Sequence, residues 1–305
     1  MSAVLTSLRI RPTAAIPSLL VLSIVGPIAS LGDYGQIASE IVYLNGALPP
    51  INQNIEECER CWRKALKLRT WRAAPDQRYS TMANRLAIFL EDQKRDAEAE
   101  YFYKEALQVS DKTIGRDHAA TSVILVNLGQ FYCRTGRLLE AEQLLNQAMY
   151  IQLREFGNTH IRTSQLMKVM GELHQARGEY SKAKAFYVQA LDIRKKYLEA
   201  DHTNIYISSI ELAQMYLQEE RPREAEPLIK NALRISEKVN GHDHPKTAHA
   251  LYCLGLTYDL FGKRAEAEKL HQEAFRILKN SQEENTEYGV VLQERLAGSL
   301  RRSDP

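Results

Sequence analysis

Four stretches of the chain share one pattern of small and apolar residues: LGQFYCRTGRLLEAE at 128–142, MGELHQARGEYSKAK at 170–184, LAQMYLQEERPREAE at 212–226 and LGLTYDLFGKRAEAE at 254–268. They align without a gap, and each begins 42 residues after the one before. The same step leads upstream to Leu86, which opens LAIFLEDQKRDAEAE, and downstream to Leu296. Such a period is typical of chains built from stacked copies of one supersecondary unit.

Alanine keeps this step at two positions in five successive units. One set is Ala99, Ala141, Ala183, Ala225 and Ala267, and the other is Ala106, Ala148, Ala190, Ala232 and Ala274. Alanine is needed where two helix axes cross closely, because a larger side chain would overpack the crossing at a cost of roughly 1–3 kcal/mol. The pattern therefore predicts two packed amphipathic helices in each unit, with both alanine sets on the second helix.

Histidine also repeats at this step between the units. His118, His160, His202 and His244 stand in the segments GRDHAATS, GNTHIRTS, EADHTNIY and GHDHPKTA. A metal site is a poor interpretation, because stacked helices lie roughly 10 Å apart whereas zinc needs ligands about 2 Å from one ion. We expect each histidine, or the aspartate beside it, to cap the helix that follows.

The alanine positions, together with Leu128, Gly129 and Tyr132, resemble the tetratricopeptide repeat, and the long period with the Asp243–His244–Pro245 turn resembles the kinesin light chain type. The resemblance covers residues 80–301 and implies an all-α solenoid, a right-handed superhelix of antiparallel helix pairs. It has about five full repeats, a partial N-terminal repeat and a C-terminal capping helix. Departures occur where the family shows asparagine on the inner helix: only Asn127 matches, against Arg85, Val169, Glu211 and Cys253. The resemblance therefore implies the fold and protein binding, not adaptation to a motor.

The repeat register divides the chain into segments. Residues 1–32 form a signal-like or membrane-anchor segment, 33–54 a linker and 55–305 the solenoid, whose partial first repeat includes a helix at 55–69. The repeat units lie near 78–119, 120–161, 162–203, 204–245 and 246–286, and the cap at 287–301.

The first 32 residues contain no acidic side chain, and their only basic ones are Arg9 and Arg11. The apolar run AAIPSLLVLSIVGPIASL follows at 14–31. A basic start, an apolar stretch and small residues after it are typical of an export signal, and a membrane anchor or an N-terminal cap are the alternatives. We expect an exported or membrane-associated protein; a cytoplasmic one is the alternative.

Composition and motifs argue against several functions. Lys and Arg number 40 against 38 Asp and Glu, so the chain lacks the basic excess of a non-specific nucleic-acid binder. No phosphate-binding loop, nucleophile elbow or paired-histidine zinc helix is present. Cys58 and Cys61 are interpreted as ordinary helix cysteines, and redox or metal chemistry is the alternative. We therefore predict no catalytic residue, no cofactor and no metal site.

Partner binding is predicted for the concave groove that the first helices of such repeats line. The register selects polar residues on three successive first helices and a group around one aromatic residue on the next: Gln130, Arg134, Glu172, Gln175, Gln214, Gln218, Tyr252, Leu256 and Asp259. We hypothesise that Tyr252 and Leu256 anchor a peptide, although an aromatic at helical spacing is commonly a core residue.

Three functions follow in order. The first is a scaffold or adaptor that binds a peptide or protein partner. The second is an exported or membrane-tethered assembly factor that uses the same repeats. The third is an enzyme or regulator, for which the repeats leave only residues 33–54. The oligomeric state is open, because terminal helices of repeat arrays often pair.

Overall fold

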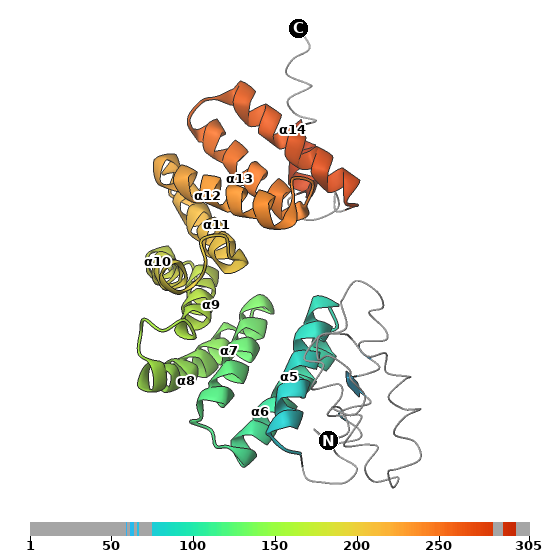
Figure 1. Ribbon diagram of the computed structural model, residues 1–305, viewed down its shortest axis with the longest axis vertical. Helices are drawn as coiled ribbons and strands as arrows, with labels where there is room; N and C mark the ends of the chain where they lie inside the picture. Colours follow the sequence, from blue (N-terminus) through green and yellow to red (C-terminus); the bar gives the residue numbers. More distant parts are fainter. Residues whose placement is uncertain (1–58, 60–61, 64–65, 67–74, 283–288, 297–305) are drawn as a thin grey trace, which may run out of the picture. The chain divides into compact units, whose positions relative to one another are not determined.

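The structure is a computed structural model that describes residues 59, 62, 63, 66, 75–282 and 289–296. The described residues form helices and no strand. The helix bounds are α5 (Gln77–Asp92), α6 (Asp96–Thr113), α7 (Ala119–Arg134), α8 (Leu138–Phe156), α9 (Thr163–Ala176), α10 (Tyr180–Tyr197), α11 (Thr203–Gln218), α12 (Pro222–Asn240), α13 (Pro245–Leu260) and α14 (Arg264–Asn280) (Figure 1). Residues 289–296, inside the expected cap, are also helical. The signal-like segment, the linker, Cys58 and Cys61 lie outside the described residues.

The chain divides into two units, residues 1–124 and 125–305. In the first unit α5 packs against α6, and the Tyr103 hydroxyl donates to Glu91 over 2.7 Å. The helical residues Trp62 and Arg63 contact this pair. The Trp62 ring meets Phe89 edge-on at 5.3 Å, and Arg63 lies 5.5 Å from the centre of the Phe102 ring.

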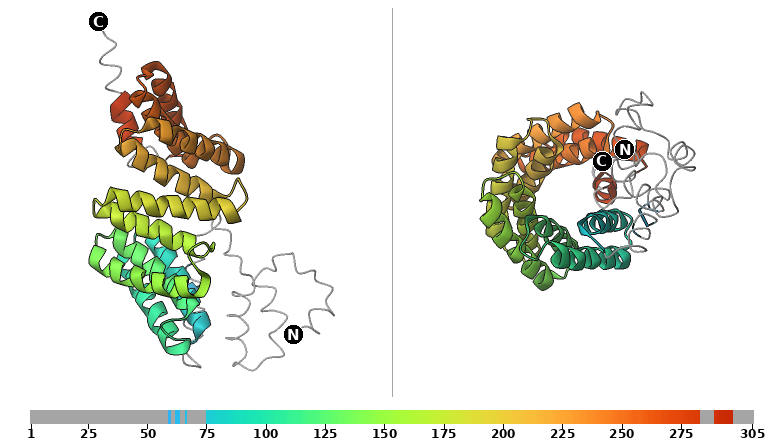
Figure 2. Two further views of the ribbon diagram at one scale, coloured as in Figure 1. Left: turned by 90° about the vertical axis from the view of Figure 1, so that its left-hand side faces the viewer. Right: turned by 60° about the horizontal axis from the view of Figure 1, so that its bottom comes forward.

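The second unit is a stack of helix pairs in chain order. α9 packs on α10, α11 on α12 and α13 on α14, while α10 packs on α11 and α12 on α13 (Figure 2). Each pair therefore contacts the pairs next to it in the chain, as in an α-solenoid. The prediction of an all-α solenoid of helix pairs is confirmed.

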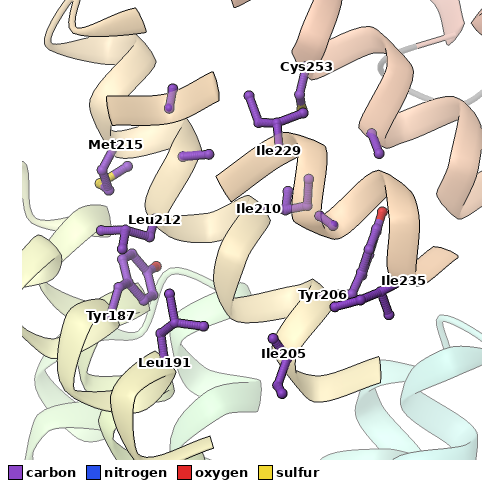
Figure 3. Packing of buried hydrophobic residues seen from close by; sticks show 14 of the residues in the cluster. Tyr187, Leu191, Ile205, Tyr206, Ile210, Leu212, Met215, Ile229, Ile235 and Cys253 are labelled. Carbon is purple, nitrogen blue, oxygen red and sulfur yellow. The ribbon is translucent and has the colours of Figure 1, made fainter. Parts of the chain in front are cut away.

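Both alanine columns lie where the register predicts, on the second helices α6, α8, α10, α12 and α14. All ten side chains are fully buried. Around α11, these alanines join a core that includes Tyr187, Leu212, Ile229 and Cys253 (Figure 3). The small side chains let the second helices approach their neighbours closely, which is why the columns keep one residue type.

Glycine allows a second close approach inside the pairs α7–α8, α9–α10 and α13–α14, whereas α5 and α11 have Ala87 and Ala213 at this position. A Cβ atom added to Gly171 on α9 would lie 2.5 Å from the Tyr187 ring on α10, and one added to Gly129 on α7 would lie 2.7 Å from Leu145 on α8. No real Cβ packs so closely, so glycine at these positions sets the spacing within the pair.

The repeated histidines cap the helices, as predicted. The Nδ1 atom of His118, His202 and His244 accepts a hydrogen bond from the backbone N–H two residues on, at 3.0–3.1 Å. His160 makes the same bond to Arg162 just before α9, also at 3.1 Å. The rings of His118, His202 and His244 thus satisfy a backbone donor that the first turn of a helix leaves free.

Candidate partner-binding surface

The first helices of the second unit are joined by a series of side-chain contacts. Between α7 and α9, the Gln165 amide donates to Gln130 over 3.3 Å. Between α9 and α11, the Lys168 ammonium lies 3.5 Å from Glu211. Between α11 and α13, Gln214 lies 3.5 Å from His249 Nε2. These contacts join the polar faces of α7, α9, α11 and α13 into one continuous surface, which we call the first-helix surface.

The predicted site residues on α7, α9 and α11 are all at least partly exposed. They differ in their exposure and in the contacts that they make within the chain. Arg134 and Gln218, at the ends of α7 and α11, are exposed. Gln130, Glu172 and Gln214 are partly exposed. These five residues belong to the first-helix surface by position.

Gln175 has a role inside the helix pair. Its side-chain oxygen accepts a hydrogen bond from the Tyr187 hydroxyl over 2.7 Å. Since Tyr187 is 1% exposed and packs against Gly171, this bond links α9 to α10 within the fold.

The group predicted on α13 is partly taken up by contacts within the chain. Tyr252 is half-buried, packs against two core clusters and lies 5.8 Å from the His271 ring. Asp259 forms an ion pair with Arg295 of the helix at 289–296. Leu256 is partly exposed. The peptide-anchor hypothesis for Tyr252 and Leu256 therefore stays a prediction, in which only part of the tyrosine ring is available.

Sequence reasoning missed a charged cluster at the middle of this surface. Lys168 on α9 is 8% exposed and forms an ion pair with Glu172, one turn along the same helix. Glu211 on α11 is the second carboxylate near its ammonium. Behind them on α10, Arg194 is 1% exposed and donates to Ser208 over 2.6 Å.

Burial controls the electrostatics of this cluster. It raises the pKa of Glu211 to about 7, with the Lys168 ammonium opposing this rise and the Glu172 carboxylate adding to it. Burial also lowers the pKa of Arg194. These directions follow from the cost of holding a charge away from water.

A sequence signal for this cluster existed. In the five repeats, the residues at the 42-residue step from Lys168 are Asn84, Val126, Ile210 and Tyr252, all uncharged, whereas those from Glu211 include the charged Arg85. A charge such as that of Lys168, in a column otherwise occupied by uncharged residues, marks a buried ion pair or a binding site.

The cysteines in the described part of the chain show no feature of a reactive site. Burial raises the pKa of Cys133 and of Cys253 to about 12, which keeps both as thiols. Over the described ranges, no group of three or more His, Cys, Asp or Glu residues is arranged to hold a metal ion. Nor is any helix there long and apolar enough to cross a bilayer.

The repeat architecture is matched by one family model. The model of the tetratricopeptide repeat matches residues 78–130, 121–196 and 204–280. The chain belongs to the tetratricopeptide repeat family. No curated protein is similar enough to be matched with it.

Solved structures of similar fold include repeats of the kinesin light chain type. The kinesin light chain repeats of Podosopora anserina are 23% identical, with a TM-score of 0.56, over 69% of this chain and 99% of theirs. BtubC from P. vanneervenii is 17% identical, with a TM-score of 0.59, over 83% of this chain and 93% of its own. A Rap protein complexed with competence and sporulation factor is 17% identical, with a TM-score of 0.55, over 81% and 72%. At these identities the likeness concerns the fold.

Tetratricopeptide repeats are protein-interaction modules and are typically not enzymes. The chain is accordingly a protein-interaction scaffold in this general sense, and the first-helix surface is its candidate binding site.

Proposed function

We propose that the scaffold holds an extended peptide or protein segment along the first-helix surface. The observation that carries this proposal is the continuity of the surface: Gln130 with Gln165, and Gln214 with His249, present polar groups at matching positions of successive helices. Side-chain amides both donate and accept hydrogen bonds, so a row of them suits the backbone of an extended segment.

A solved structure of similar fold supports the same mode of action. The Rap protein was crystallised with competence and sporulation factor bound. For the present chain we propose a protein or peptide ligand, whose sequence the surface alone does not specify.

Capture from the native cell tests this proposal. The full chain is compared with a variant carrying Gln130→Ala, Gln165→Ala and Gln214→Ala. The matched control carries Gln143→Ala, Gln189→Ala and Gln272→Ala, which alter exposed glutamines of the second helices. We expect a reproducible partner with the full chain and the control, and its loss with the first variant. Equal capture by all three would contradict the proposal.

The anchor on α13 needs its own variants. Tyr252 contributes to two core clusters, so its truncation would also disturb packing. Leu256→Ala is the cleaner change, and Tyr252→Phe removes only the hydroxyl. If Leu256→Ala leaves capture unchanged, Leu256 is not an anchor.

The place of action is a separate proposal. The basic start and the apolar run at 14–31 favour export or membrane association of the scaffold. Fractionation of cells that express the full chain, beside a version without residues 1–32, tests it. A distribution that does not change between the two versions would contradict it.

A further inference from the structure

The contact between α9 and α11 differs in kind from the other contacts along the first-helix surface. The contacts on either side of it are between neutral side chains, Gln130 with Gln165 and Gln214 with His249. Here two carboxylates, Glu172 and Glu211, lie near the one ammonium of Lys168. One ammonium cannot fully compensate the negative charge of two carboxylates that lie close to it at a site with little access to water.

The carboxylates are also incompletely hydrogen-bonded. Among the described residues, the buried Oε2 atoms of Glu172 and Glu211 have no hydrogen-bond partner. The Glu211 side chain is 18% exposed, so water screens its charge poorly. Losing a hydrogen-bond partner costs most when the buried atom is charged, and a proton on Glu211 would remove that charge.

Within the described part of the chain, the other elements around Glu211 do not supply a second compensating ion pair. From α10, the Arg194 guanidinium attracts its carboxylate but is hydrogen-bonded to Ser208, Asn204 and Gln165. Tyr187 on the same helix is buried, and its hydroxyl donates a hydrogen bond to Gln175. From α12, the packing against α11 is apolar, through Ala225, Ile229 and Ala232. On the α13 side, His249 and Cys253 contact Gln214, one turn along α11.

We propose that Lys168, Glu172 and Glu211 form a proton-sensitive joint between the α9–α10 and α11–α12 pairs. A proton on Glu211 removes one of the two competing carboxylates and tightens the packing of α11 against α9. Loss of that proton leaves both carboxylates to share the Lys168 ammonium and loosens the joint. The proposal does not depend on whether a partner binds.

The sign of the pH effect follows from the position of the titration. The pKa of Glu211 is raised in the fold, to about 7 from 4.5. Between these values the folded chain binds more protons than the unfolded chain, so its stability falls as pH rises. The joint is tight below neutral pH and weakened above it.

Hydrogen exchange of the full chain tests the joint directly. After correction for the intrinsic pH dependence of exchange, we expect the protection of α11 amides to fall about tenfold between pH 6 and pH 8. Glu211→Gln should abolish this fall. The control is Glu226→Gln, which removes a surface partner of Lys230 on α12 and should keep the fall. A fall that persists in Glu211→Gln would overturn the proposal.

A carboxyl-carbon NMR titration of the glutamate-labelled full chain provides a second test. We expect one glutamate to titrate near pH 7 in the wild type and to move to higher pH in Lys168→Met, which lacks the neighbouring ammonium. The wild-type titration needs no variant to fold. If every glutamate titrates near its ordinary value, the proposal is wrong.

Discussion

The alanine columns of the second helices and the columns of the first helices follow the same 42-residue step, but they differ in how strictly their residues repeat. All ten alanines are fully buried between helices. The first-helix column that contains Lys168 has Asn84, Val126, Ile210 and Tyr252 in the other repeats. The two alanine columns keep one side chain, whereas the first-helix surface changes its chemistry from repeat to repeat. The repeated positions therefore determine how the helices stack, and the varied positions determine the chemistry of the first-helix surface.

The largest effect is expected at a varied position. Lys168→Met leaves the Glu172 and Glu211 carboxylates without their shared cation, and should lower the free energy of unfolding by about 3 kcal/mol at pH 8. Urea unfolding measures this loss, which should shrink at pH 5.5, where Glu211 is protonated. Lys230→Met, which breaks a surface pair with Glu226, should change stability by less than about 1 kcal/mol. Equal losses in the two variants would mean that Lys168 is no more than a surface residue.

A repeated position comes next. Ala190→Leu should overpack the cluster that Ala190 forms with Met167 and Ile193, at a cost of about 2 kcal/mol. Ala185→Leu places the same side chain at an exposed position of the same helix and should cost little. If both variants unfold at the same urea concentration, the alanine column does not set the helix spacing.

The histidine caps are also repeated positions, and a smaller effect is expected from their loss. His202→Ala removes the acceptor for the Asn204 N–H at the start of α11, and should cost about 1 kcal/mol. His242→Ala is a matched control, because that histidine contacts surface glutamates and caps no helix. Thermal unfolding that shifts equally in both variants would contradict a capping role.

The smallest effect concerns a varied position under the first-helix surface. His271 occupies the place where earlier repeats have Tyr187 and Ile229, and its ring is buried against Gly255. Burial, with Arg295 nearby, lowers its pKa, so the neutral ring's stabilisation is present above the unfolded pKa of about 6.5 and is lost as pH falls. Between pH 7.5 and pH 5, the free energy of unfolding should fall by up to about 1 kcal/mol less in His271→Leu than in the wild type. An identical loss in both proteins, measured by urea unfolding at the two pH values, would refute this.

The regular part of the molecule could be predicted from its sequence. The spacing of Ala183 and Ala225 and the histidine caps each reflect a local or nearest-neighbour constraint, which one period expresses directly. Gln130 and Gln214, which the register places on the first helices, are partly exposed there. Their role in binding stays a prediction.

The charged cluster could not be predicted from the period alone. Lys168, Arg194 and Glu211 lie on three different helices, and their partners depend on which side chains face each other across the stack. Gln175 was assigned to the groove from its register alone. Its bond to Tyr187 could not be predicted in this way, because Tyr187 lies on the partner helix of the same pair. Departures from the repeat are informative, but their partners become visible only in three dimensions.

Site-specific photo-crosslinking in the native cell tests the central claim most directly. The crosslinker replaces Gln218, an exposed residue at the end of the first helix α11, or Gln189, an exposed residue of the second helix α10. The account predicts a discrete crosslinked partner from position 218 and none from position 189. A partner crosslinked from position 189 alone would contradict binding along the first-helix surface.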